Sequence, residues 1–339
     1  MSITDVAFVA QAVEDAPEEA IEGRSQWALT WRRLKSDRIA MASIGVIVFV
    51  ILAAIFAPVV AAVLHHGEYQ PFTNSGTNAF GQPVGPGTHG FPLGTDFLGR
   101  DLLVRILYGA RISLEVGILT TLAAAIMGTS IGLVAGYFGG WVDNILARFI
   151  DAALAFPLIV LSLALAAVFH PNIFIVFGVI TFFSWAGISR VVRGQTLSLK
   201  EKEYIEAARS LGAGPWRIMF IDILPNVLGP VLVLSTLFIP TAVSFEATLS
   251  YLGIGIPPPA PSWGNILSEA QQHINSWWYV VFPAAALLIT TLAFNLLGDG
   301  IRDAMDPRTE RLLAGRKLSK RQRRRMAVAA ADPVAGEAG

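Results

Sequence analysis

The chain has 339 residues, of which 54% are hydrophobic and 15% are charged, and its formal net charge is zero. A mean hydropathy of +0.57 excludes an ordinary water-soluble domain, and the lack of cysteine excludes disulfides, thiolate nucleophiles and cysteine-ligated metals. Several apolar blocks reach the length of about 20 residues that a helix needs to cross a bilayer. We therefore predict an all-α polytopic membrane protein.

The segment 1–38 is predicted to be a tail that precedes the first crossing. It lacks the basic start and adjoining apolar core of a cleavable signal peptide. Its last part, 27–38, reads "WALTWRRLKSDR" and has the pattern of a basic amphipathic helix lying on a membrane surface. A solvated basic segment beside the membrane is the alternative.

Six membrane-spanning helices are predicted, at residues 39–64, 114–137, 145–169, 173–192, 227–249 and 279–297. An even number of crossings places both termini on one side. Lys and Arg gather before the first span, between the fourth and fifth spans and after the last one, whereas the other side carries only Arg100, Arg105 and Arg111. Because short loops rich in Lys and Arg stay in the cytoplasm, we predict that both termini are cytoplasmic.

This topology divides the chain into four parts. After the tail at 1–38, residues 39–113 contain the first span and an extracytoplasmic loop, and residues 114–305 form a core of five spans with a cytoplasmic loop at 200–225. Residues 306–339 form a basic cytoplasmic tail. Its run "KRQRRR" at 320–325 is either a site for anionic lipid headgroups or a cluster that only orients the chain.

All five histidines map to the extracytoplasmic side of this topology. Clustered imidazoles bind transition metals, but these side chains lie in loops and their spacing does not show that they converge. We favour solvated positions over a metal site, which needs several ligands held together. The five are His65, His66, His89, His170 and His273.

Small and charged side chains in the second and third spans predict how the helices pack. Gly128, Gly132 and Gly136 recur every four residues, which puts three small residues on one helix face and lets a neighbouring helix approach closely. Arg148 and Asp151 are three residues apart and are predicted to pair on one face of the third span as a structural contact.

The stretch "YIEAARSLGAGPWRIMFIDILPN", residues 204–226, predicts a helical elbow between the fourth and fifth spans. Glu201, Glu203 and Glu206 favour the N-terminal end of a short helix, and Gly212 suits its C-terminal cap. After the turn "GAGPW", a second helix is predicted from Trp216 to Leu224, leading to Pro225 and the fifth span. The elbow would project on the cytoplasmic side.

Polar side chains at membrane depth are candidates for a solute pathway, because they are costly where they face lipid. Glu246 is either buried with a partner or hydrated near the outer boundary of its span, and we favour hydration. The candidates are Ser184, Ser189 and Arg190 in the fourth span, and Ser235, Thr236, Thr241, Ser244, Glu246 and Thr248 in the fifth.

The run "PPPAPSWGN", residues 257–265, follows the fifth span on the outside. Its prolines stiffen an extended segment, and Trp263 offers an amphipathic surface. We predict an external gate or a dock for a binding protein around Pro259 and Trp263. A rigid cap between two spans is the alternative, and both roles can hold together.

The elbow resembles the EAA motif of ABC importer permeases, whose conserved spacing falls on Glu206, Ala207, Ala208, Gly212, Leu224 and Pro225. A position that is often Ile or His in that family is Asp222 here. Four further blocks, at 91–117, 141–165, 250–267 and 295–308, resemble in order the dipeptide/oligopeptide/nickel permease family, specifically its C-type subunit. The resemblance covers about residues 91–308.

The resemblance implies a MetI-like transmembrane domain of a type I importer in the bacterial cytoplasmic membrane. The chain would form half of a heterodimeric pathway with a homologous permease, two ATPase subunits and an extracytoplasmic binding protein. The substrate would be a di- or oligopeptide, or alternatively nickel, haem or an oligosaccharide. In that family the elbow docks on the ATPase, which implies as coupling residues Glu201, Glu203, Glu206, Ala207, Ala208, Leu211, Gly212, Asp222 and Pro225.

Two other classes of function fit this sequence less well. The sequence has no G-x-x-x-x-G-K-[ST] phosphate loop, so ATP and Mg²⁺ are expected on partner subunits, with no cofactor, metal, catalytic residue or nucleic-acid site in this chain. An intramembrane protease would need a nucleophile and a base at membrane depth, but the histidines map to external loops. A stand-alone channel or carrier would have no need for an elbow.

Overall fold

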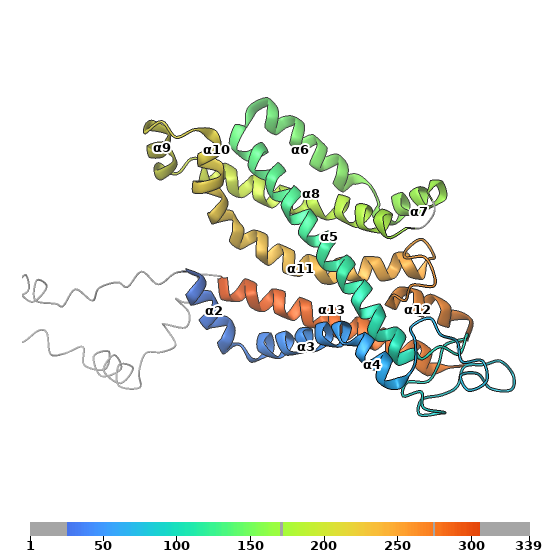
Figure 1. The fold of residues 1–339 in the computed structure, drawn as a ribbon. Coiled ribbons are helices and arrows are strands. Elements are labelled where there is room, and N and C mark those ends of the chain that lie inside the picture. The colour runs from blue at the N-terminus through green and yellow to red at the C-terminus, as the bar shows by residue number, and fades with distance from the viewer. Residues whose placement is uncertain (1–25, 170–171, 274, 306–339) are drawn as a thin grey trace, which may run out of the picture.

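The computed structural model describes residues 26–169, 172–273 and 275–305, which are helical apart from loops and three isolated bridges (Figure 1). The expected all-α class is confirmed for these residues. Residues 1–25, the basic tail at 306–339 and His170 lie outside them. The helices are α2 (Gln26–Ser36), α3 (Arg38–Ile55), α4 (Ala57–Leu64), α5 (Leu102–Phe138), α6 (Gly140–Ala155), α7 (Leu158–Val168), α8 (Ile173–Leu199), α9 (Glu203–Ser210), α10 (Pro215–Arg217), α11 (Leu224–Tyr251), α12 (Trp263–Ala270) and α13 (Trp277–Met305).

Five helical stretches of the described chain are long and apolar enough to cross a membrane. They are α3, α5, α8, the run from α10 through α11, and α13. The pair α6–α7 is a further candidate, but it bends by 80°. The predicted third span at 145–169 is therefore broken, because Pro157 disfavours a helical conformation at Phe156, which is extended with φ −77° and ψ 130°.

Side-chain caps explain where several helices begin. The Asp101 carboxylate accepts a hydrogen bond from the Val104 N–H at 3.2 Å, so α5 starts well before the predicted residue 114. Asn172 caps α8 through the Phe174 N–H, and Ser262 caps α12 through the Asn265 N–H. Each cap satisfies a backbone N–H group that has no partner within its own helix.

The glycine face of α5 packs against α8. A Cβ added at Gly128 would lie 2.6 Å from the Trp185 carbonyl oxygen, and one at Gly132 would lie 2.7 Å from that of Ser189. No real side chain tolerates such distances, so the two helices approach as closely as their backbones allow. The predicted role of the glycine stripe is confirmed.

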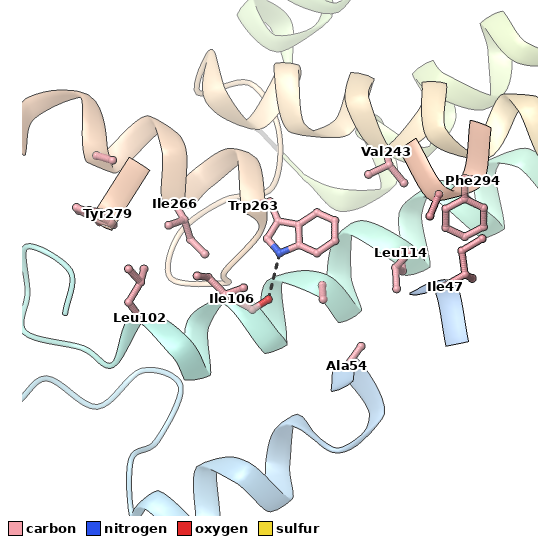
Figure 2. Packing of buried hydrophobic residues seen from close by; sticks show 13 residues of the cluster. Ile47, Ala54, Leu102, Ile106, Leu114, Val243, Trp263, Ile266, Tyr279 and Phe294 are labelled. Carbon is pink, nitrogen blue, oxygen red and sulfur yellow. Dashed lines mark hydrogen bonds between the residues drawn. The ribbon is translucent and has the colours of Figure 1, made fainter. Parts of the chain in front are cut away.

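A hydrophobic core lies where α3, α5, α11, α12 and α13 meet around Trp263 (Figure 2). It includes Ile47, Leu114, Val243 and Phe294, all buried. The α12 helix and the long segment 65–101 lie at one end of the molecule, here named the loop end (Figure 1). The opposite end, which carries α9, α10 and α2, is named the elbow end. Helix α2 covers most of the segment predicted to be helical and lies against the end of α13, where Nη1 of Arg33 donates to the Ala304 carbonyl at 3.3 Å.

Candidate functional site

The elbow is built on α9, which ends in a Schellman motif. The Ala213 N–H donates to the Ala208 carbonyl and the Gly212 N–H donates to the Arg209 carbonyl, both at 3.0 Å. Gly212 has φ +85°, the left-handed conformation that this motif requires. The helix end is therefore closed by its own backbone, and α9 is a defined element rather than a flexible loop.

The elbow exposes one set of residues and buries another. Glu201, Glu203, Glu206 and Ala207 are exposed, and Leu211 is 89% exposed. Ile205 is fully buried in the core formed by α5, α8 and α11, and it anchors α9 to the bundle. Ile205 was not predicted as the anchor of the elbow, although an apolar residue within a charged helix is a sequence signal for such a buried contact.

The second helix of the elbow does not stop at Pro225. After α10 the chain forms a π-helical turn, Ile218–Ile223, which runs directly into α11. The Leu224 N–H donates to the Met219 carbonyl five residues back, and Pro225 occupies the first turn of α11 directly after this π-helical turn. Asp222 lies in this turn, and its Oδ2 is buried without a hydrogen-bond partner among the described residues.

The candidate pathway residues fall into two groups. Ser244 is exposed and Ser184 and Thr236 are half-buried, each hydroxyl bonding a carbonyl of its own helix. Ser189 is fully buried at the contact with α5. Because Ser189 is buried, these four residues are not all accessible on the surface of this chain.

Glu246 is buried, so the favoured interpretation of a hydrated carboxylate is wrong. Its Oε2 accepts from the Ser113 hydroxyl at 2.7 Å and its Oε1 accepts from the Ser250 hydroxyl at 2.8 Å. Ser250 in turn accepts from the Ile256 N–H. These bonds tie α11 to α5 and to the proline-rich turn.

The ion pair predicted between Arg148 and Asp151 is also wrong. Asp151 of α6 instead accepts from Nη2 of Arg190 on α8 at 2.7 Å. Nearer the elbow end, Arg193 of α8 donates to both carboxylate oxygens of Asp143 on α6. Two bridges between helices thus replace one bridge within a helix.

At the loop end, Trp263 does not offer a surface. It is 1% exposed, and its indole N–H donates to the Ile106 carbonyl at 3.1 Å (Figure 2). Asn265 fixes the proline-rich turn through bonds to the carbonyls of Ile256 and Ala260. Pro259 is exposed, so it is the predicted external residue that remains accessible.

A charged network at the loop end was missed by the sequence analysis. Arg105 donates to Asp96 at 2.6 Å and to Glu269 at 3.1 Å, Arg100 donates to Glu269 at 3.1 Å, and the Tyr279 hydroxyl donates to Glu269 at 2.8 Å. Burial alone would raise the pKa of Glu269, but the hydrogen bond and charge of Arg105, with the charge of Arg100, hold that pKa below its ordinary value. The sequence signal for this network was the presence of Arg100 and Arg105 on the predicted outer side of the chain, which has few basic residues.

The described residues contain no group of three or more His, Cys, Asp or Glu side chains that could hold a metal ion. His66 instead lies with its Nδ1 2.6 Å from Oδ2 of Asp101. Residues 128–132 have the G-x-S-x-G spacing of a serine nucleophile, but Ser130 lies inside α5 and donates to the Ile126 carbonyl. It does not sit on the strand-to-helix turn that exposes such a nucleophile.

Comparison with known proteins assigns the family. Residues 128–311 match the binding-protein-dependent transport system inner membrane component, and residues 25–83 match the N-terminal TM domain of oligopeptide transport permease C. The chain is 40% identical over 294 residues to the dipeptide transport system permease protein DppC of Alkalihalophilus pseudofirmus, covering 86% of this chain and 93% of that protein. It is 40% identical over 303 residues to the oligopeptide transport system permease protein OppC of Haemophilus influenzae, covering 89% and 94%.

Further relatives agree with this assignment. The glutathione transport system permease protein GsiD of Pectobacterium atrosepticum is 40% identical over 286 residues, covering 84% of this chain and 92% of that protein. Among solved structures, an inward-facing conformation of the MetNI methionine ABC transporter has a TM-score of 0.49 at 19% identity, covering 59% of this chain and 96% of that chain. The assignment rests on the sequence relatives. The chain belongs to the binding-protein-dependent transport system inner membrane components and is a permease subunit of an ABC importer, a multi-pass protein of the bacterial cytoplasmic membrane.

Proposed function

We propose that this permease forms one half of the translocation pathway of a type I, MetI-like importer for di- or oligopeptides, with six spans and both termini in the cytoplasm. The named relatives are permeases for dipeptides, oligopeptides and glutathione, which share a peptide backbone. Nickel, haem or an oligosaccharide is the alternative cargo, and the associated binding protein selects among them. The four-part division at 1–38, 39–113, 114–305 and 306–339 belongs to the same proposal.

The elbow is the observation that carries this proposal. It combines a backbone-closed helix end at Gly212, exposed carboxylates at Glu203 and Glu206, and an exposed Leu211, all anchored by buried Ile205. Such a protruding rigid helix can transmit motion, whereas a flexible loop would absorb it. The elbow would dock on one of two ATPase subunits, which bind ATP and Mg²⁺, while an extracytoplasmic binding protein delivers the peptide.

The proposed mechanism is alternating access. ATP binding closes the ATPase pair, the docked elbows move with it, and the helix bundles of this chain and its sister permease swing between inward-open and outward-open states. The coupling contact would extend from Glu201 to Gly212, with Ala207 and Ala208 at its centre. Asp222 and Pro225 would act through the start of α11. Ser184, Thr236 and Ser244 are among the pathway candidates that this chain leaves accessible.

Reconstitution of the full complex tests the proposal. The permease pair, the ATPases and the binding protein are placed in proteoliposomes, and ATP-dependent uptake of labelled di- and oligopeptides is measured. We expect Glu206→Lys to abolish substrate-stimulated ATP hydrolysis while the complex still assembles. The matched control is Asp303→Lys, an exposed carboxylate near the elbow end of α13, which should behave as the parent. Normal coupling in the Glu206 variant would contradict the docking role, and uptake of another cargo class would contradict the peptide assignment.

A further inference from the structure

The ion pair between Asp151 of α6 and Arg190 of α8 lies outside the elbow, and Arg190 is one of the polar pathway candidates. One hydrogen bond of 2.7 Å joins Nη2 of Arg190 to Oδ1 of Asp151. The side chains are far from buried in this chain, with 57% of Arg190 and 64% of Asp151 exposed.

Both residues lie deep along their helices. Trp141, which is 76% exposed, stands just after the turn between α5 and α6, a position typical of tryptophan at a membrane boundary. Lys200 reaches the same turn at Gly139. Asp151 is ten residues from Trp141 and Arg190 is ten residues from Lys200. At 1.5 Å per residue, the pair lies about 15 Å from the elbow end of these helices, which is about half of a 30 Å hydrocarbon core.

The other side of the bundle shows what a lipid-facing surface of this chain looks like. Helices α3 and α13 lie opposite α6 in Figure 1. They expose large apolar side chains such as Phe49 at 71% and Leu288 at 65%. Neither residues 39–55 nor residues 277–297 contain a charged residue. A charged pair at mid-depth is costly against lipid, so the side of α6 and α8 that carries it faces protein or water.

The bend between α6 and α7 also indicates that this side of the bundle does not face lipid. The helix breaks between Ala155 and Leu158, and Phe156 at the bend is 57% exposed. A helix that ends leaves its last carbonyl groups without intrahelical partners. Lipid cannot satisfy these groups, so non-helical backbone at this depth is tolerated where protein covers it or where it lines a water-filled cavity.

Hydrogen-bonding capacity separates these two cases. A guanidinium offers five N–H donors and a carboxylate two acceptor oxygens, whereas the bond between Arg190 and Asp151 uses one of each. A covering protein surface would have to meet the remaining groups in fixed geometry, but water meets them without constraint. We propose that the side of α6 and α8 bearing Asp151 and Arg190 lines the water-filled translocation pathway, with the pair as a charged element of its wall. This inference rests on the proposed function, since it presupposes a pathway.

Thiol accessibility tests the inference, because the chain contains no cysteine of its own. Leu154→Cys places a thiol one turn beyond Asp151 on an exposed side of α6 and leaves the ion pair intact; Leu154 is 40% exposed. Leu288→Cys on α13 is the lipid-facing control. The full complex in inside-out vesicles is treated with a membrane-impermeant charged methanethiosulfonate, and modification of this chain is followed by mass spectrometry. Because the thiolate is the reacting form, we expect Leu154→Cys to react about tenfold faster than Leu288→Cys.

Equal, slow reaction at both positions would overturn the inference, whether lipid or the sister permease covers the surface. If Leu154→Cys does not assemble, Val191→Cys beside Arg190 replaces it, since Val191 is also exposed. ATP-driven release of labelled peptide, loaded with the binding protein into the lumen of the same inside-out vesicles, separates the two proposals. Fast labelling without peptide release contradicts the peptide importer and keeps the water-exposed wall, whereas release with slow labelling contradicts the wall alone.

Discussion

Gly212 closes the elbow with a backbone conformation that other residues adopt at a cost. Its φ is +85°, and a Cβ there would meet nothing within 4 Å, so the penalty of Gly212→Ala comes from the backbone alone. We expect about 1 kcal/mol of local destabilisation at the end of α9. Substrate-stimulated ATP hydrolysis by the reconstituted complex should fall about fivefold, because 1 kcal/mol corresponds to that factor in a docking equilibrium.

Gly214→Ala is the matched control for this prediction. Gly214 also has open space around a built Cβ, but its φ is −74°, which any residue adopts. Equal effects of the two substitutions on ATP hydrolysis would show that the Schellman motif is not what matters at Gly212.

Glu269 makes the loop end sensitive to acid. Its carboxylate is held by two arginines and by Tyr279, and its pKa lies below the ordinary value. A lowered folded-state pKa stabilises the protein above the unfolded-state pKa of about 4.3, and this stabilisation is lost as the pH falls through the folded-state value. Glu269→Gln should cost about 3 kcal/mol at pH 7, because the buried Arg100 and Arg105 would then share one carboxylate, that of Asp96.

The thermal unfolding midpoint of the purified complex at pH 7 and at pH 4 measures this effect. The difference in midpoint between the parent and the Glu269 variant should narrow at the lower pH, where the Glu269 carboxylate of the unfolded parent begins to take up a proton. Glu115→Gln removes a carboxylate from a pair with Arg111 that is more than half exposed, and it should change little at either pH. If the difference in thermal midpoint widens as the pH falls, the stabilising role of the ionised Glu269 carboxylate is contradicted.

At the scale of whole elements, the contact between α5 and α8 depends on missing side chains. Gly132→Ala would set a Cβ 2.7 Å from the Ser189 carbonyl and 2.8 Å from Cβ of Val192. The helices would have to separate, at a cost of about 1–3 kcal/mol. Gly194→Ala on α8 has open space and should be neutral or stabilising, since alanine favours a helix. The thermal midpoint of Gly132→Ala should therefore fall, whereas that of Gly194→Ala should stay the same or rise.

The elements that could be predicted are those whose partners lie close by in sequence. The cap at Gly212 and the glycine face of α5 follow from spacing alone, and so did the existence of most spans. The bend at Phe156 had a local signal in Pro157, but the apolar runs on both sides outweighed it. Three hydrogen bonds join residues that are far apart in the sequence. The pair Asp151–Arg190 is separated by 39 residues, Glu246–Ser113 by 133 and Trp263–Ile106 by 157. Tertiary packing selects such partners, and no local pattern encodes it.

For the molecule as a whole, the proposed topology places the loop end outside the cell and the elbow end in the cytoplasm. Phe80 and Leu211 mark the two ends with nearly equal exposure, 88% and 89%. In spheroplasts, a membrane-impermeant maleimide should label Phe80→Cys at once and Leu211→Cys only after the membrane is permeabilised. Labelling of Leu211→Cys in sealed spheroplasts would invert the topology.

The glycine stripe has a consequence for the length of the molecule. Gly128, Gly132 and Gly136 meet the carbonyl oxygens of Trp185, Ser189 and Arg193, so two series with the same four-residue step lie side by side, backbone against backbone. Helix α5 begins at the loop end and α8 leads into the elbow. This match fixes the distance between the loop end and the elbow, whatever side chains cover the remaining faces of the two helices.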